Sequence, residues 1–266
     1  MIEATYTPEF KLLKDAYLGS RTSLQSKLDY LANMAQEETW DYKGTYEKQI
    51  LYNYLCYSYD RLVQEDKIEI SEDGQHMCFN TGLLTHNGSD IYALFDLNKN
   101  DFAHEDQKWY LYGFKKKTDR EMQEFRHFPD IADYFTQPED FIYNRNMPLA
   151  IDYDHIIDDN YERFQEIGLD DKYMIQGLLE NAVKRILEKV KRNYKLAIPQ
   201  FYTDKQTGES KIQLLMPLYM QKRNKADLAL VVDKDNYKYI GKTILPIQWA
   251  YANSRRIVKP DVDWLK

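Results

Sequence analysis

Apolar residues recur at helical spacing in two stretches of the first half of this 266-residue chain. The first helix is predicted to begin at Thr22-x-x-Gln25, which matches a capping box, and the second to run from about Tyr46 to Glu65. The repeating positions are Leu24, Leu28, Leu31 and Ala35 in the first stretch, and Leu51, Tyr54, Leu55, Ser58 and Leu62 in the second.

Short apolar stretches then predict four strands, Lys67–Ile70, His76–Phe79, Asp90–Asp96 and Lys108–Phe114. The first two flank Asp73-Gly74, a dipeptide typical of hairpin turns. Between Thr118 and Pro148 the pattern is irregular and interrupted by prolines, so we expect any boundary between two lobes near Pro148.

The second half combines helical and strand patterns. A short helical region is predicted around Asp154–Phe164, a long helix from about Asp171 to Lys191, and a last helix over Ile247–Ile257. A four-strand meander lies between the last two, at Leu196–Tyr202, Lys211–Tyr219, Asp227–Asp233 and Tyr237–Leu245.

Helices grouped beside antiparallel strands predict an α+β fold. We expect an N-terminal lobe of helices and antiparallel strands (1–147), and a C-terminal lobe (148–266) in which a long helix packs on the meander. The two could equally form one continuous domain. The sequence shows no internal repeat.

Composition favours a soluble cytoplasmic protein. Hydrophobic residues make up 43% of the chain and charged residues 30%, and no apolar run approaches the length of a membrane span. The first ten residues do not have the pattern of a secretory signal. Two isolated cysteines, Cys56 and Cys78, do not form a disulfide framework or a zinc motif, which agrees with a reducing compartment.

Charge is unevenly distributed along the chain. The formal net charge is −7, yet residues 184–225 contain eleven Lys or Arg against three acidic residues, a local charge of +8 that leaves −15 for the remainder. A basic zone on an acidic body suits one specific anionic ligand better than general coating of DNA. A solvated helix end and hairpin rim would give the same pattern.

Established catalytic motifs are absent from the sequence. Gly241-Lys242-Thr243 resembles the end of a P-loop, but position 236 is Asn where that motif needs glycine, and the segment reads as a strand. The five histidines lack metal-ligand spacing, so no metal ligands are predicted.

One polar cluster falls in the short helical region: Asp154, His155, Asp158, Asp159, Asn160 and Arg163. On a helix, His155 and Asp159 share a face, and Asn160 lies one turn from Arg163. A histidine among carboxylates can act as general acid or base, and clustered carboxylates can hold Mg²⁺ through water. The alternative is a helix capped by Asp152 or Asp154, with the other residues facing solvent.

A second polar group surrounds the end of the long helix, where Arg192, Asn193, Tyr194 and Lys195 precede a strand. Because strand side chains alternate, Gln200 and Tyr202 project to one side, and Gln213 lies on the partner strand. Cations suit phosphate oxygens, and amides suit base edges. Farther along, Asp227 opens an apolar run with Arg192 and Arg255 as candidate partners, and Asn253 and Arg255 on the last helix are candidates for the same pocket.

Five segments, occurring in this order, resemble a large uncharacterised bacterial domain family: Asn80-Thr81-Gly82-Leu83, residues 193–202, residues 212–218, Ala226-Asp227-Leu228-Ala229-Leu230 and residues 250–257. The resemblance extends from about Leu31 to Leu265. Some members are fused to cold-shock or LOTUS-type (OST-HTH) RNA-binding domains, which implies a role with RNA or nucleotides but no particular catalytic mechanism. The chain departs from the family pattern at Phe201, Ser254 and Arg256.

The recurrent polar positions of the family match Asn80, Asp154, His155, Asn160, Arg163, Asn193, Lys195, Gln200, Gln213, Asp227, Asn253 and Arg255. Our first hypothesis is an RNA- or nucleotide-binding protein that holds a phosphate-bearing ligand in a basic, amide-rich pocket of the C-terminal half. The alternative is a hydrolase of nucleotides or RNA ends, in which His155, Asp154, Lys195 and Asp227 act on a phosphoester or phosphoanhydride, with Mg²⁺ as a candidate cofactor. A tyrosine-rich interaction scaffold, including a homo-oligomer, is the third hypothesis.

Overall fold

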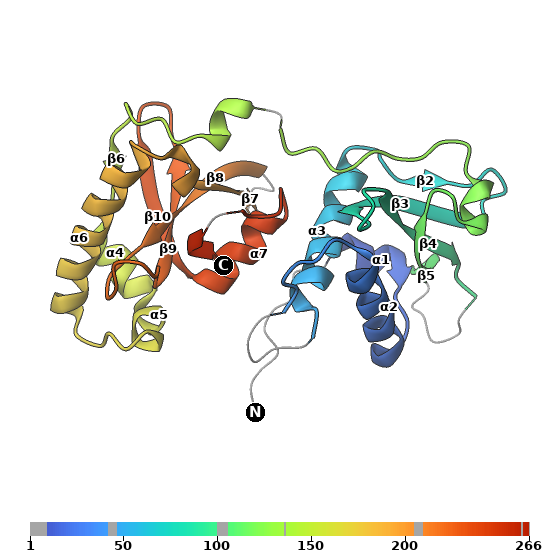
Figure 1. Cartoon of the computed structure of the whole chain (residues 1–266), viewed down its shortest axis with the longest axis horizontal. Helices are drawn as coiled ribbons and strands as arrows, with labels where there is room; N and C mark the ends of the chain where they lie inside the picture. Colours follow the sequence, from blue (N-terminus) through green and yellow to red (C-terminus); the bar gives the residue numbers. More distant parts are fainter. Residues whose placement is uncertain are drawn as a thin grey trace. The chain divides into compact units, whose positions relative to one another are not determined.

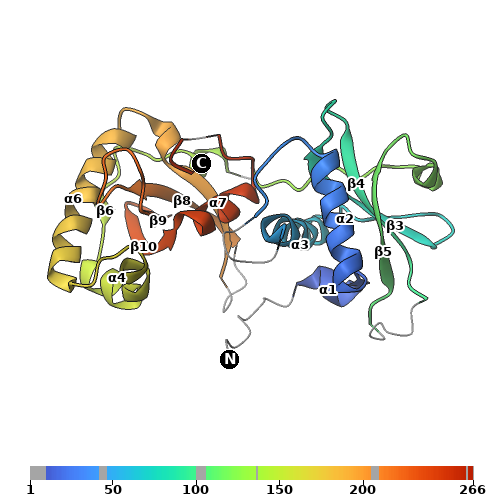
Figure 2. The ribbon, with the colours of Figure 1, turned by 60° about the horizontal axis from the view of Figure 1, so that its bottom comes forward.

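The protein was analysed as a computed structural model, which describes residues 10–41, 47–99, 106–135, 137–204, 210–261 and 263–265. The chain divides into two compact units, Met1–Asp133 and Tyr134–Lys266, and each contains one five-stranded sheet (Figures 1 and 2). The α+β fold expected from the sequence is confirmed. In the described residues, no helix has the length and apolar character needed to cross a membrane.

The first unit places helices before its meander. Its elements are α1 (Lys11–Asp15), β1 (Ala16–Tyr17), α2 (Arg21–Met34), α3 (Gln49–Gln64), β2 (Glu69–Ile70), β3 (His76–Leu84), β4 (Asp90–Leu97), β5 (Trp109–Lys116) and the 3-10 helix η1 (Arg120–Glu124). The sheet has the order β1-β5-β4-β3-β2; β1 pairs parallel with β5, and the other pairs are antiparallel. One face packs on the helices, and the other, with Cys78, Tyr92 and Leu94, is covered by Met122 and Phe125.

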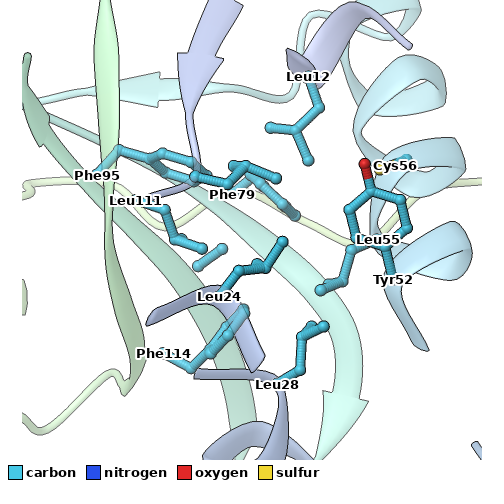
Figure 3. A pocket seen from close by; sticks show the side chains of 12 residues that line it. Leu12, Leu24, Leu28, Tyr52, Leu55, Cys56, Phe79, Phe95, Leu111 and Phe114 are labelled. Atoms are coloured by element: carbon cyan, nitrogen blue, oxygen red, sulfur yellow. The ribbon is translucent and has the colours of Figure 1, made fainter. Parts of the chain in front are cut away.

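The core between the helices and the first sheet is apolar and nearly filled. Figure 3 shows Leu24 and Leu28 of α2, Leu55 and Cys56 of α3, and sheet residues such as Phe79 pointing toward one another. The space left between them is about 10 Å³, which is at the lower limit for one water molecule. This gap is therefore an imperfection of core packing and offers no room for a ligand. Both cysteines are buried and unbridged.

The second unit is a three-layer sandwich. Its elements are η2 (Pro138–Phe141), β6 (Leu149–Ala150), α4 (Tyr153–Asp159), α5 (Tyr161–Glu166), α6 (Lys172–Val190), η3 (Tyr194–Leu196), β7 (Ile198–Thr203), β8 (Ser210–Leu218), β9 (Leu228–Lys234), β10 (Tyr239–Pro246), α7 (Ile247–Arg255) and η4 (Asp263–Leu265). The sheet order is β6-β10-β9-β8-β7, with β6 parallel to β10. In Figure 1, α6 lies on one face of this sheet and α7 on the other.

The alternating side chains of β9 explain why this sheet is covered on both faces. Leu228, Leu230 and Val232 belong to the core on the α6 side, and Ala229 and Val231 to the core on the α7 side. A strand buried on both faces has no polar alternation, so it appears as the continuous apolar run seen in the sequence.

The two sheets share one strand order. In each unit, a two-residue strand comes first, helices follow, and a four-strand meander ends beside that first strand. No repeat is visible in the sequence because the common features are topological rather than conserved residue by residue.

Two details of the fold differ from the sequence predictions, and a third falls outside the described residues. Helix α2 is capped by Ser20, whose hydroxyl accepts a hydrogen bond from the Ser23 backbone N–H at 3.3 Å, so the predicted capping box at Thr22 is wrong. Helix α3 is described from Gln49 onward, and Tyr46 lies outside the described residues. The two-residue strands β1 and β6 were not predicted.

The division between units falls after Asp133, upstream of the boundary expected near Pro148. The irregular segment joins the second unit through its side chains. The ring of Tyr143 lies 4.5 Å from that of Tyr239, and Asp140 forms a 2.6 Å ion pair with Lys234. These contacts tie the segment to the second sheet although it contains little regular structure.

Candidate functional site

An open pocket of about 430 Å³ lies at the C-terminal end of α6. It is lined by Ile142, Tyr143, Asn144, Arg145, Asn146, Val190, Lys191, Arg192 and Tyr194. Helix α6 begins at the Asp171 cap, as its sequence pattern predicted, and its last residue, Val190, is buried in the core. Burial of Val190 brings Lys191 and Arg192, the next residues, to the surface at the pocket rim.

The opposite side of the pocket is a turn held by the second sheet. The backbone N–H of Asn144 donates to the Tyr239 hydroxyl at 3.0 Å, and the Asn144 side-chain oxygen accepts from the backbone N–H of Asn146 at 3.0 Å. The buried Tyr143 ring anchors this turn against Tyr239. Arg145 is therefore presented to solvent on a fixed backbone.

The pocket is positively charged. Arg192 and Lys191 share one acidic partner, Glu188, at 2.8 and 3.0 Å. Hydrogen bonds from Arg192 and Lys191 lower the pKa of Glu188, so this carboxylate stays ionised. Three cations against one carboxylate leave a net charge of +2, which favours an anionic ligand.

Tyr194 adds an exposed aromatic surface to the pocket. Tyr194 is 57% exposed and is the first residue of the 3-10 helix η3. Asn193 caps this helix, since its side-chain oxygen accepts a hydrogen bond from the Lys195 N–H at 3.2 Å. An exposed ring beside cations can stack on a nucleobase or hold other planar groups. Lys195 itself is exposed and does not line the pocket.

Gln200, Gln213 and Asn253 come together on the α7 side of the sheet, as the sequence suggested. Gln200 donates to Gln213 at 2.9 Å, and Asn253 donates to Gln200 at 3.1 Å. Arg256 extends the chain by donating to Asn253 at 3.1 Å. Arg255 on the same helix is buried, and Tyr202 lies on the exposed continuation of β7.

Asn160 and Arg163 form a third group with the end of β10. One Arg163 nitrogen donates to the Asn160 side chain and to the backbone oxygen of Ile244, and lies 3.2 Å from the Thr243 hydroxyl. The guanidinium also lies 5.2 Å from the centre of the Trp249 ring. Because this nitrogen bonds to Asn160 at the end of α4 and to Ile244 of β10, Arg163 holds α5 against the sheet.

His155 lies on the exposed surface of α4. Its ring is 3.1 Å from Asp159, the neighbour expected from helical spacing, and the His155 side chain is 64% exposed. Asp152 caps the helix by accepting from the His155 N–H at 3.0 Å, and Asp154 faces solvent. Within the described part of the chain, no hydrogen bond or ion pair joins His155 to Lys195 or Asp227.

Asp227 and Asn80 are engaged with backbone groups. One Asp227 oxygen accepts from the N–H groups of Met220 and Gln221 at 2.8 and 2.9 Å, which closes the turn before β9. Arg192, a partner expected for Asp227, pairs with Glu188 instead. In the first unit, the buried Asn80 side chain accepts from the Gly82 N–H at 3.0 Å.

The residues predicted from sequence therefore fall into separate groups, and the pocket adds others. Arg145, Asn144 and Asn146 were missed because their segment has no periodicity to mark it. For Mg²⁺, the described residues contain no group of three or more His, Cys, Asp or Glu side chains arranged to hold a metal ion.

Comparison with known proteins gives a family but no function. A family model described as "Domain of unknown function (DUF3825)" matches residues 31–264, which include parts of both units. No curated protein matches the chain, and neither does any solved structure.

Proposed function

The chain belongs to the DUF3825 family, a domain of unknown function, and we propose that it binds RNA or a nucleotide through the phosphate in the pocket at the end of α6. The observation that carries this proposal is the convergence of Arg145, Lys191 and Arg192 around one pocket with the exposed ring of Tyr194.

The pocket has the size and chemistry for such a ligand. Its volume of about 430 Å³ lies in the range of small-molecule sites. Arginine forks match phosphate oxygens, and Asn144 and Asn146 add amide groups beside them. Ile142 and Tyr143 give the pocket apolar surface for the uncharged part of the ligand. The expectation of RNA itself comes from the family resemblance.

Binding without turnover fits this pocket better than hydrolysis. Among the described residues that line it, none is Asp, Glu or His, the side chains that most often act as general acid or base in hydrolysis. The exposed His155–Asp159 pair, on which the hydrolase hypothesis depends, lies on α4 and does not line the pocket.

Thermal unfolding in the presence of nucleotides, inorganic pyrophosphate and short RNAs tests the proposal. A ligand that binds only the native state, at a concentration of about a hundred times its Kd, adds about 2.7 kcal/mol to the free energy of unfolding. Such a gain raises Tm by several degrees. We expect a shift with phosphate-bearing ligands, reduced in Arg145→Gln and Arg192→Gln. Arg185→Gln, which removes an exposed cation from the same helix outside the pocket, should keep the full shift.

Two results would oppose this function. Equal shifts in all three variants would place the ligand elsewhere. No shift with any phosphate-bearing ligand, from a protein with a sharp unfolding transition, would favour the scaffold hypothesis.

A further inference from the structure

Asp233, near the end of β9, has a carboxylate that the fold satisfies only in part. The residue is 6% exposed, and its Oδ2 lies 2.5 Å from the Lys211 ammonium. The other oxygen, Oδ1, is buried and has no hydrogen-bond partner in the part of the chain that the structure describes. Buried acceptors are nearly always paired, and an unpaired one weakens the fold, so such an atom calls for a partner such as a water molecule or a ligand.

The register of the sheet places Gln213 across from Asp233. Antiparallel pairing of Leu214 with Val232 brings Gln213 opposite Asp233 at the following position, and Gln200 pairs with Gln213 on the other side. By strand alternation, these three polar residues face the α7 side. They form one buried polar row across β7, β8 and β9.

The buried polar row has a side-chain donor left for a ligand. The Gln213 oxygen accepts from Gln200, and the Gln200 oxygen accepts from Asn253. Among the described residues, the Gln213 amide nitrogen, a donor, makes no hydrogen bond. Two cross-strand neighbours, Gln213 and Asp233, thus offer one donor and one acceptor that the described residues do not use.

The charge of the row favours a neutral partner over a cation. Lys211 already balances Asp233, so a second cation would bring an uncompensated charge to a buried site. An uncharged group with one N–H donor beside one acceptor matches both atoms at once. Every nucleobase presents such an edge, and hydrogen bonds to this edge are how extruded bases are read.

The next row of the sheet provides the approach. Tyr202 pairs with Lys211 across β7 and β8, and both are exposed. A base could stack on the Tyr202 ring and reach the buried row from there.

We propose that Gln213 and Asp233 form a nucleobase-reading site on the α7 side of the second sheet. This site goes beyond the proposed function, since it lies on the opposite side of the sheet from the α6 pocket and does not need a phosphate.

The wild-type protein gives the first test, by NMR titration with the four ribonucleosides, which lack phosphate. We expect at least one nucleoside to shift the side-chain amide signals of Gln213. Methylation of the N–H groups on the base edge of that nucleoside should weaken binding about tenfold or more, because Asp233 Oδ1 would again be unpaired. No shift with any nucleoside, or no effect of methylation, would overturn the proposal and leave Oδ1 to a water molecule.

Variants give the second test. Asp233→Asn keeps one oxygen for Lys211 and turns a donor toward the base, and Gln213→Met removes the donor, so each should weaken nucleoside binding about tenfold or more. Asp140→Asn is the matched control, since it removes the charge of another Asp–Lys pair, and it should bind like wild type. Wild-type affinity in a folded Asp233→Asn or Gln213→Met variant would contradict the site.

Ligand choice separates this site from the phosphate pocket. Inorganic pyrophosphate has no base and reports on the pocket alone, whereas the side-chain amide signals of Gln213 report on a nucleoside at the Gln213–Asp233 site. Asp233→Asn should leave pyrophosphate binding intact, and Arg192→Gln should leave the nucleoside-induced shift of the Gln213 amide signals intact.

Discussion

The structure shows how carboxylates with similar surroundings in the sequence have different roles in the fold. Asp227 precedes an apolar run, and its side chain closes a turn through two backbone N–H groups. Asp233 ends the same run, and one of its oxygens has no partner among the described residues. The sequence pointed to Asp227 and missed Asp233, because a strand pattern does not reveal which side-chain oxygens the neighbouring strands will satisfy.

Asp60, on α3, gives a prediction about pH. Desolvation of its half-buried carboxyl raises its pKa to about 6; backbone hydrogen bonds from Lys11 and Leu12 oppose the shift, and the charge of Asp15 adds to it. Since the pKa in the folded state is above the ordinary value of 3.8, the folded state binds more protons between about pH 4 and 6. Stability from this group is therefore full below that window and falls as pH rises through it.

Asp60→Asn should remove this pH dependence. The amide oxygen can still accept from the Lys11 N–H, so the variant should be more stable than wild type at pH 8, by about 1 kcal/mol after allowance for solvent screening. The gain should disappear near pH 4. Urea unfolding at several pH values checks this, with the exposed Asp130→Asn as control. A gain that does not change with pH would show that burial of Asp60 is not its cause.

At the scale of elements, periodicity was enough to predict the long helix and the four-strand meander of the second unit. Those elements have sustained patterns set by burial on one or both faces. The strands β1 and β6 could not be found this way, because two residues are too few to show alternation. Ser20 was missed as the cap of α2 because Thr22, two residues on, matched the capping motif better.

Gly82 in β3 supplies a prediction about how an element meets its neighbour. Its φ is +73°, and a Cβ at this position would lie 2.6 Å from the hydroxyl oxygen of Tyr54 on α3. That hydroxyl donates to the Thr81 carbonyl at 2.8 Å. The strand thus approaches the helix closely where its pairing with β4 is irregular.

Gly82→Ala should lower the free energy of unfolding by about 2 kcal/mol or more, from backbone strain plus the clash. In a Tyr54→Phe background, which removes the clashing oxygen, the loss should shrink by about 1 kcal/mol. Chemical denaturation of both single variants and the double variant measures this coupling. Gly113→Ala is the control, because a Cβ there meets no described atom within 4 Å. If Gly82→Ala lowered the free energy of unfolding as little as this control, backbone strain at Gly82 would be refuted.

For the whole molecule, the sequence predicted the α+β class but placed the division between lobes too far along the chain. The segment 134–147 joins the second unit through Tyr143 and Asp140, whose partners lie about a hundred residues away. The same segment forms one side of the phosphate pocket, so the pocket could not be assembled from local patterns. Of its lining residues, Arg192 was predicted as a site residue, Tyr194 was noted beside it, and Lys191 was counted in the basic zone at 184–225.

The central claim is that the cations of this pocket bind phosphates, and the salt dependence of RNA binding tests it most directly. The affinity of a short single-stranded RNA should fall with salt, with a log–log slope of about −2 for three neutralised phosphates. The Arg145→Gln/Arg192→Gln double variant should bind more weakly and reduce that slope by about 1.4, since two of the cations are lost. An unchanged slope and affinity in the double variant would contradict the account.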